Sequence, residues 1–242
     1  MFTDSDYDKL EQLMAERPEN EALIKKLLDS HKETISTISH EIRNPLTLVY
    51  STLQLIESRH PEVNSFRYWD SLRTDIEYMK QLLEELSAFN NGSSLTLKTF
   101  DFRQFMEQLV LSFAISCTDS DIEFTSFLEL ELPEIQADPI KLREVFLNLL
   151  RNAREAIVGT GSIRLDAVFS DNQIQITIQD SGCGIPEEYL ADIFTPFVTH
   201  KSSGTGLGLA IAKRTIESHH GSITVSSQPG TGTVFTITLP VS

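Results

Sequence analysis

His40 lies in a short segment whose side chains are suited to nucleophilic and acid–base chemistry. Residues 39–46 read Ser-His-Glu-Ile-Arg-Asn-Pro-Leu, so the carboxylate of Glu41 is adjacent to the imidazole and the amide of Asn44 follows four residues later. Residues four apart share a helical face, so Asn44 is expected beside His40. Pro45 cannot donate to the carbonyl of Glu41 and is expected to loosen the helix just beyond His40. The segment alone also fits a surface histidine on a kinked helix.

Two asparagines interrupt an apolar helical pattern later in the chain. Asn148 and Asn152 are four residues apart in the segment Asn-Leu-Leu-Arg-Asn-Ala, so both amides project from one helical face. Asparagine inside a helix competes with the backbone for hydrogen bonds and is mildly unfavourable there. The pair is therefore either two solvated polar residues or a functional site. Because Mg²⁺ prefers oxygen ligands, the functional interpretation is a pair that holds Mg²⁺ and phosphate oxygens.

A carboxylate and two glycines directly follow a predicted strand. Asp180, Gly182 and Gly184 belong to the segment Asp-Ser-Gly-Cys-Gly-Ile-Pro. Glycine permits positive φ and a close approach of the backbone to a planar ligand, and a carboxylate accepts a hydrogen bond from an exocyclic amine such as that of adenine. Taken alone, this segment is weak evidence for a ligand, and a tight turn without one is the default interpretation.

A second glycine-rich segment opens a predicted helix. Gly204, Gly206 and Gly208 alternate with other residues, and Lys201 precedes them. Glycine amides at a helix N-terminus bind anions, so phosphates are expected at this point. The spacing is neither that of a Walker A loop nor that of a dinucleotide fingerprint. The small polar residues 199–203 are suited to a movable lid.

His40 is expected in the first of two long helices. Apolar residues recur every three or four positions over residues 20–56 and again over residues 66–89, and Pro61 separates the two runs. Such a pair predicts an antiparallel helical hairpin. A single hairpin leaves both apolar stripes half exposed, so two copies are expected to pair into a four-helix bundle, as a homodimer.

The second half of the chain mixes strands and helices. Residues 90–94 are polar and turn-forming, which is typical of a linker. Asp138 and Pro139 provide the N-cap and the first position of the helix that carries the asparagines, and Gly221 is expected to end the last helix as a left-handed cap. Helices on one side of a mixed sheet predict an α/β sandwich. Strands are expected at residues 95–100, 122–132, 163–169, 174–178, 223–226 and 233–239, and helices over about 102–109, 139–158 and 207–218.

Charge and composition narrow the function classes. The 242 residues carry a formal net charge of −15, whereas nucleic-acid binders are usually basic, so no nucleic-acid partner is expected. Two cysteines without metal-like spacing are consistent with a reducing compartment. The sequence contains no run of eighteen or more apolar residues, the length that a membrane-spanning helix needs. A cytoplasmic chain is therefore expected.

The four segments in this order resemble a known family. The asparagine block, the aspartate–glycine block, an aromatic block Ile-Phe-Thr-Pro-Phe at residues 193–197 and the glycine block occur in this order. They are similar to the ATP-binding domain shared by histidine kinases, gyrase, the 90-kDa chaperone and the mismatch-repair ATPases. The segment around His40 resembles the phosphoacceptor box of sensor histidine kinases. Among these kinases, the sequence around Asn148 is most similar to the nitrogen-regulation and sporulation subgroups. The resemblance implies a helical hairpin forming a dimeric four-helix bundle, followed by an α/β sandwich ATP-binding domain.

The same resemblance implies domains, roles and partners. The expected domains are an N-terminal helical extension at 1–30, a dimerisation and phosphotransfer hairpin at 31–90, a linker at 91–95 and a catalytic domain at 96–242. The implied activity uses ATP and Mg²⁺ to phosphorylate His40, then passes the phosphoryl group to a response regulator. In the hairpin, the resemblance implies that His40 is the phosphoacceptor, that Glu41 orients or deprotonates its ring, and that Asn44 serves a phosphatase function. In the catalytic domain, it implies that Asn148 and Asn152 bind phosphate and metal, with Asn152 the direct Mg²⁺ ligand, and that Asp180 recognises adenine in a pocket shaped by Gly182 and Gly184. The remaining implied roles are phosphate binding by Lys201, Gly204, Gly206 and Gly208, and packing of the lid base by Phe194 and Phe197.

Two other functions compete with this one. An ATP-hydrolysing clamp of the gyrase or mismatch-repair kind carries a glutamate four residues before its metal-binding asparagine, and here that position is Asn148, so hydrolysis lacks an obvious base. A degenerate phosphotransfer or binding module is the other alternative, and the intact glycine and asparagine blocks disfavour it.

Overall fold

The structure, a computed structural model, describes residues 18–91, 95–118, 120–201 and 204–241. The chain divides into two compact units, Met1–Asn91 and Gly92–Ser242. Residues 1–17 of the expected N-terminal extension, 92–94 of the expected linker and 202–203 of the expected lid lie outside the described residues.

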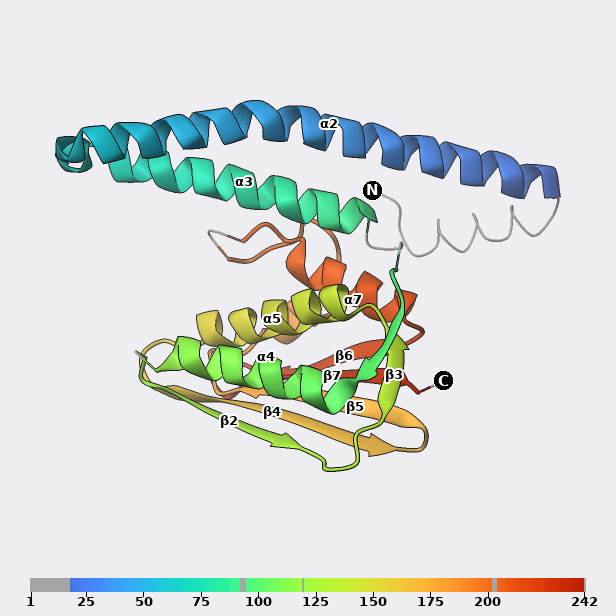
Figure 1. The fold of residues 1–242 in the computed structure, drawn as a ribbon. Helices are drawn as coiled ribbons and strands as arrows, with labels where there is room; N and C mark the ends of the chain where they lie inside the picture. The colour runs from blue at the N-terminus through green and yellow to red at the C-terminus, as the bar shows by residue number, and fades with distance from the viewer. Residues whose placement is uncertain (1–17, 92–94, 119, 202–203, 242) are drawn as a thin grey trace. The chain divides into compact units, whose positions relative to one another are not determined.

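The first unit is a hairpin of two long helices (Figure 1). Helix α2 spans Pro18–Arg59 and helix α3 spans Trp69–Asn91, with the 3-10 helix η1 at Pro61–Ser65 between them, so the expected hairpin is confirmed. Helix α2 continues through Pro45, because one missing N–H removes one hydrogen bond and leaves the remaining ladder intact. Phe66 was expected in the second helix but precedes it, because its backbone is extended and Tyr68 has a positive φ of 75°.

The apolar stripe of α2 is wider than the seam between the two helices. Leu53 of α2 and Ile76 and Leu83 of α3 are buried. By contrast, Ile38 and Ile42 are each 48% exposed, Leu46 is partly buried, and Val49, further along the same stripe, is 46% exposed. Leu72 and Met79 of α3 are also exposed. One side of the hairpin therefore retains uncovered apolar side chains.

The second unit is built on a mixed five-stranded sheet. The strand order is β2-β4-β5-β7-β6, in which β2 is parallel to β4 and every other neighbouring pair is antiparallel. Strands β1 and β3 form a separate two-stranded antiparallel sheet. The strands are β1 (Lys98–Asp101), β2 (Ile122–Leu128), β3 (Glu134–Ala137), β4 (Gly161–Ser170), β5 (Gln173–Asp180), β6 (Ser222–Gln228) and β7 (Gly232–Pro240).

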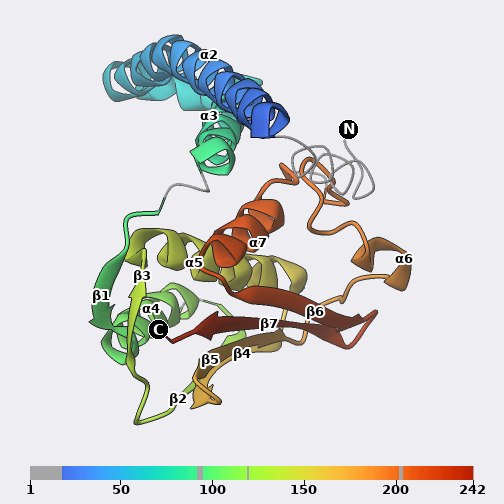
Figure 2. The same ribbon diagram turned by 90° about the vertical axis from the view of Figure 1, so that its right-hand side faces the viewer.

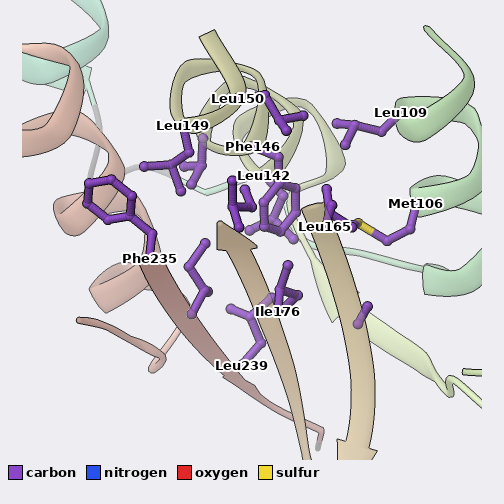
Figure 3. Packing of buried hydrophobic residues seen from close by; sticks show 14 of the residues in the cluster. Met106, Leu109, Leu142, Phe146, Leu149, Leu150, Leu165, Ile176, Phe235 and Leu239 are labelled. Carbon is purple, nitrogen blue, oxygen red and sulfur yellow. The ribbon is translucent and has the colours of Figure 1, made fainter. Parts of the chain in front are cut away.

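Three helices cover one face of the five-stranded sheet (Figure 2). They are α4 (Phe102–Cys117), α5 (Pro139–Ala156) and α7 (Gly208–Ser218), and the short α6 spans Glu187–Leu190. This arrangement confirms the expected sandwich. Figure 3 shows Phe146 of α5 above Ile176 of β5, with Met106 of α4 to the right, and Phe146 and Met106 have no exposed surface. Each such side chain contributes about 1.5–3 kcal/mol by burial, which fixes α5 on the sheet.

Two local predictions for this unit were wrong. The run expected as one strand over residues 122–132 ends at Leu128, since Leu130 is 82% exposed in a turn, and the separate strand β3 follows Pro133. The residue with left-handed backbone after α7 is His220, with φ of 60°, and not Gly221. A β-carbon on Gly221 would collide with the carbonyl oxygen of Thr238, so this glycine permits close packing on β7.

Candidate functional site

His40 is exposed on the surface of α2. The contact to its ring comes from Arg43, whose Nη1 lies 3.2 Å from Nδ1 of His40. Glu41 and Asn44 are exposed as well, and the structure shows no hydrogen bond between either side chain and the ring within residues 18–91. The segment therefore presents an accessible imidazole, one turn from an accessible amide.

The start of α5 is fixed by Asp138. Its Oδ1 accepts hydrogen bonds from the backbone N–H groups of Ile140 (3.1 Å) and Lys141 (3.2 Å), and its Oδ2 accepts from Thr96 N–H (2.8 Å). Burial raises the pKa of Asp138, but these N–H donors and the charge of Lys141 outweigh it and leave the pKa below its usual value. The expected N-cap is present, and it sets the position of the helix that carries both asparagines.

A buried histidine connects the end of α7 to the start of α5. The backbone N–H of Asp138 donates to Nε2 of His219 (2.9 Å), so the ring proton lies on Nδ1 and is donated to the carbonyl of Thr215 (2.7 Å). Burial lowers the pKa of His219 most strongly, against an opposing effect of the Thr215 hydrogen bond. The neutral ring thus joins the two helices on which the asparagine and glycine segments lie.

Asn148 and Asn152 reach different neighbours in the second unit. Asn148 Oδ1 accepts from Arg151 (3.1 Å), and its amide lies against Gly208 at the start of α7, where an added β-carbon would come within 2.7 Å of Oδ1. Asn152 Oδ1 accepts from Nζ of Lys201 (3.0 Å). Asn148 therefore contacts the glycine-rich segment itself, and Asn152 is hydrogen-bonded to Lys201, just before that segment.

Lys201 also pairs with a residue that the sequence did not single out. Its Nζ lies 2.6 Å from Oε2 of Glu155, which is one helical turn after Asn152. The two partners are 46 residues apart in sequence, and only the packing of α5 beside the lid segment brings them together. A cation is thus already held against the oxygen that the sequence assigned to Mg²⁺.

Asp180 is buried at the end of β5, with 4% of its surface exposed. It accepts the N–H of Gly182 (2.8 Å). Burial raises its pKa above the usual value, and the hydrogen bonds from Gly182 and Thr233 and the charge of Lys201 only partly oppose this effect. A carboxylate has two acceptor oxygens with about four lone-pair sites, so Asp180 can accept a further donor from a ligand.

The backbone requires glycine at two positions of these loops. Gly184 has φ of 69°, and a β-carbon there would collide with the carbonyl oxygen of Gln228. Gly206 has φ of 70°, and a β-carbon there would lie 2.6 Å from the backbone carbon of Phe197. Both loops are therefore shaped by conformations that other residues rarely adopt.

The two phenylalanines expected at the base of the lid behave differently. Phe194 packs at the edge of the core, with its ring centroid 6.4 Å from that of Phe235, and Nζ of Lys213 lies 5.7 Å from its centroid. Phe197 is 57% exposed and has φ of 65°, so the expectation that its side chain packs the lid base is wrong. Its backbone N–H instead donates to the carbonyl of Gly206 (2.9 Å).

Known proteins share both units of this chain. Residues 30–93 match the model of the His Kinase A (phospho-acceptor) domain, and residues 137–242 match that of the histidine kinase-, DNA gyrase B-, and HSP90-like ATPase. A phosphoacceptor hairpin followed by this ATPase fold defines a class, and the chain belongs to the sensor histidine kinases.

Particular relatives extend over most of the chain. It is 34% identical over 87% of its length to the signal transduction histidine-protein kinase AtoS of Escherichia coli (strain K12), and 31% identical over 86% to sporulation kinase C of Bacillus subtilis (strain 168). It spans only 35% and 49% of those two proteins. A crystal structure of full-length ShkA in complex with AMPPNP is similar over 87% of this chain and 46% of that one, with a TM-score of 0.74 and 27% identity.

The second unit offers acceptor groups and a cation that suit a nucleotide. The buried Asp180 retains capacity for a donor, and Asn152 Oδ1 is close to a lysine cation. Among the described residues there is no group of three or more His, Cys, Asp or Glu side chains suited to a metal ion. No helix in that part of the chain is long and apolar enough to cross a membrane.

Proposed function

We propose that this chain uses ATP to phosphorylate His40 and then passes the phosphoryl group to an aspartate of a response regulator. The observation that carries the proposal is the convergence in the second unit of Asp180, Asn152 and Lys201, while the first unit exposes an imidazole. The AMPPNP bound by ShkA, an analogue of ATP, supports the same ligand class. Because ATP is the phosphoryl donor, the proposed compartment is the cytoplasm.

The proposed nucleotide site assigns one task to each segment. Asp180 accepts the exocyclic amine of adenine, and Gly182 and Gly184 keep the backbone close to the base. Gly204, Gly206 and Gly208 supply the loop that binds phosphates, and Lys201 moves from Asn152 to a phosphate oxygen. Bound Mg²⁺ would neutralise phosphate charge. Asn152 would hold it, and Asn148 would keep the start of α7 against α5.

The proposed transfer begins with a neutral imidazole. A ring nitrogen of His40 attacks the γ-phosphorus in line, an N–P bond forms, and the bond to ADP breaks. Glu41 is proposed to orient the ring or to take its proton. The product bond is reactive enough to pass its phosphoryl group to a carboxylate of the regulator.

A homodimer is part of the proposal. Ile38, Ile42 and Val49 on α2 and Leu72 and Met79 on α3 leave one side of the hairpin apolar and exposed, and a second copy would cover it as a four-helix bundle. The proposed boundaries are an extension at 1–30, a phosphotransfer hairpin at 31–90, a linker at 91–95 and a catalytic domain at 96–242.

Hydrolysis by a gyrase-like clamp is not favoured. Asn148 occupies the position at which those ATPases carry a glutamate, and its amide cannot act as a general base. The hairpin that bears His40 would also have no role in such an enzyme.

The proposed kinase activity is tested by the chemistry of the label. The chain is incubated with Mg²⁺ and ATP labelled either at the γ-phosphate or at the α-phosphate. We expect incorporation only from the γ-position, in a bond that is labile in acid and stable in base. A stable label in acid would indicate a hydroxyl acceptor, and labelling from the α-position would indicate nucleotidyl transfer; both results would contradict the proposal.

Asn44 is proposed to serve the reverse reaction. Its amide is one turn from His40, where it would orient water toward an aspartyl phosphate by positioning. We expect Asn44→Ala to keep autophosphorylation within about threefold and to lose phosphatase activity toward the phosphorylated regulator. Ser51→Ala, at another exposed polar position of the same helix, is the matched control. If Asn44→Ala dephosphorylates the regulator as fast as the parent in the presence of ADP, the chain is a kinase alone.

A further inference from the structure

Arg43 is held between the two helices of the hairpin, next to His40. Its side chain is half-buried; Nη2 donates to the carbonyl of Leu83 on α3 (3.4 Å), and Nη1 lies 3.2 Å from Nδ1 of His40. Its Nε is buried and has no hydrogen-bond partner among the described residues. The guanidinium is therefore directed at the ring by its attachment to α3.

The contact determines which nitrogen of His40 carries the proton. A guanidinium has only donors, so Nδ1 of His40 must accept with its lone pair. A neutral imidazole has one N–H, so in this arrangement the proton lies on Nε2. The ring as found has no lone pair free on Nε2, and Arg43 must release Nδ1 before Nε2 can attack phosphorus.

The same contact suits the phosphorylated ring without any change. Once Nε2 is bonded to phosphorus and the ring proton has left, Nδ1 has a lone pair and no proton. We propose, on the basis of the proposed phosphorylation of His40, that Arg43 is a positioning residue that donates to Nδ1 of the Nε2-phosphorylated ring, opposes protonation there, and lengthens the life of the phosphohistidine.

The chemistry of hydrolysis explains why this contact affects lifetime. Water attacks phosphorus, an O–P bond forms, and the N–P bond breaks with its electron pair going to Nε2. If Nδ1 is protonated, the ring leaves as neutral imidazole; if it is not, the ring leaves as an imidazolide anion, which is a far poorer leaving group. A donor that occupies Nδ1 competes with the proton and slows the loss of phosphate.

Other charges near this part of the hairpin have different partners. On α3, Nζ of Lys80 lies 3.9 Å from Glu84 and 5.3 Å from the centroid of Tyr50, and Glu85 accepts from Gln81 (2.7 Å). On α2, the charged neighbour in sequence is Glu41, which is exposed. Arg43 is therefore the charged side chain with a contact to the ring in the described part of the hairpin.

The test measures loss of phosphate from His40 against pH without relying on kinase activity. Phosphoramidate phosphorylates histidine directly, and the same treatment of His40→Gln gives the background from other histidines. Arg43→Met keeps an unbranched apolar side chain without a donor, and Arg43→Gln keeps an N–H donor without the charge. Arg73→Met is the matched control, because Arg73 lies near Glu57 and Asp70 at the other end of the hairpin.

We expect Arg43→Met to lose phosphate about tenfold faster near pH 7, as removal of one hydrogen bond to a charged group predicts. The midpoint of its pH profile should move up by about one pH unit, with an unchanged rate at the acid plateau. Arg43→Gln should fall between Met and the parent, and Arg73→Met should match the parent. Superimposable profiles for Arg43→Met and the parent would overturn the proposal. If the chain took up no label from ATP, the proposed kinase activity would be contradicted. The phosphoramidate measurement would still decide whether Arg43 protects the phosphohistidine.

Discussion

The two units of the chain differ in how completely each covers its own apolar surface. The α/β unit encloses a core in which Phe102, Phe146 and Leu149 have no exposed surface, whereas Ile42 and Val49 of the hairpin are nearly half exposed. A sheet covered by three helices closes a core by itself, but two helices have only one seam. The α/β unit thus encloses its own core, whereas the hairpin leaves an apolar side uncovered, and this is the side that the proposed homodimer would bury.

The same difference extends to the functional residues. Asp180 is buried in the α/β unit and is hydrogen-bonded by the loop that follows it, while His40 is exposed on the hairpin. A binding site gains from a fixed, desolvated arrangement, and a phosphoacceptor must remain accessible both to ATP and to a regulator. The two halves of the proposed reaction should therefore be separable by mutation.

The largest effect is expected from Asp180→Asn. The substitution keeps the size of the side chain but presents an amide donor where the amine of adenine also donates, so labelling should fall by about 100-fold or more. The dimer should persist, because Asp180 and the hairpin belong to separate compact units. Light scattering reports the dimer and labelled ATP reports the activity; a monomer would show that the two regions are not independent.

The exposed side of the hairpin gives the next largest effect. Ile42→Glu should weaken dimerisation by about 100-fold, because it places a charge in an interface that would otherwise be apolar. Leu48→Glu is the matched control, since Leu48 is 70% exposed on a different face of α2. Sedimentation across a dilution series measures both variants. Equal dissociation constants would mean that the Ile38–Ile42–Val49 side is not the interface.

Gly206→Ala sharpens the comparison within the α/β unit. Its positive φ and the backbone of Phe197 leave no room for a β-carbon, and the resulting strain of about 1–3 kcal/mol should weaken binding of AMPPNP by roughly tenfold or more. Gly230→Ala is a control with similar strain, because Gly230 has φ of 77° but no atom within 4 Å of an added β-carbon. Identical AMPPNP affinities in the two variants would show that the Gly206 loop does not contribute to the phosphate site.

The sequence predicted both units and the order of their elements because local signals were strong. Apolar periodicity identified α2 and α3, and Asp138 with Pro139 identified the start of α5. The pairs Lys201–Glu155 and Arg43–Leu83 could not be predicted, since each depends on packing between segments far apart in the chain. The same holds for Gly221, whose role depends on its distance to Thr238 and not on its own backbone angle.

The smallest effect is expected from the histidine that joins α5 and α7. Replacing His219 with Leu leaves the N–H of Asp138 unsatisfied and should lower the free energy of unfolding by about 1–3 kcal/mol. In the parent, the lowered pKa of His219 means that the unfolded chain binds the proton more readily, so stability is lost as the pH falls from about 6.5 toward the folded pKa.

Urea unfolding at several pH values checks this assignment. The loss of stability between about pH 6.5 and the folded pKa should be smaller in His219→Leu than in the parent. His220→Asn is the control, since asparagine tolerates the left-handed backbone at that exposed position. Parallel pH profiles for the parent and His219→Leu would remove His219 as the source of the acid sensitivity.

The most direct test of two separable halves is a paired measurement on His40→Gln. The variant removes an exposed acceptor and leaves the α/β unit unchanged, so AMPPNP should bind with the affinity of the parent while the acid-labile label from γ-labelled ATP disappears. Retention of the acid-labile label at the parental level, or loss of AMPPNP binding together with the label, would contradict the account.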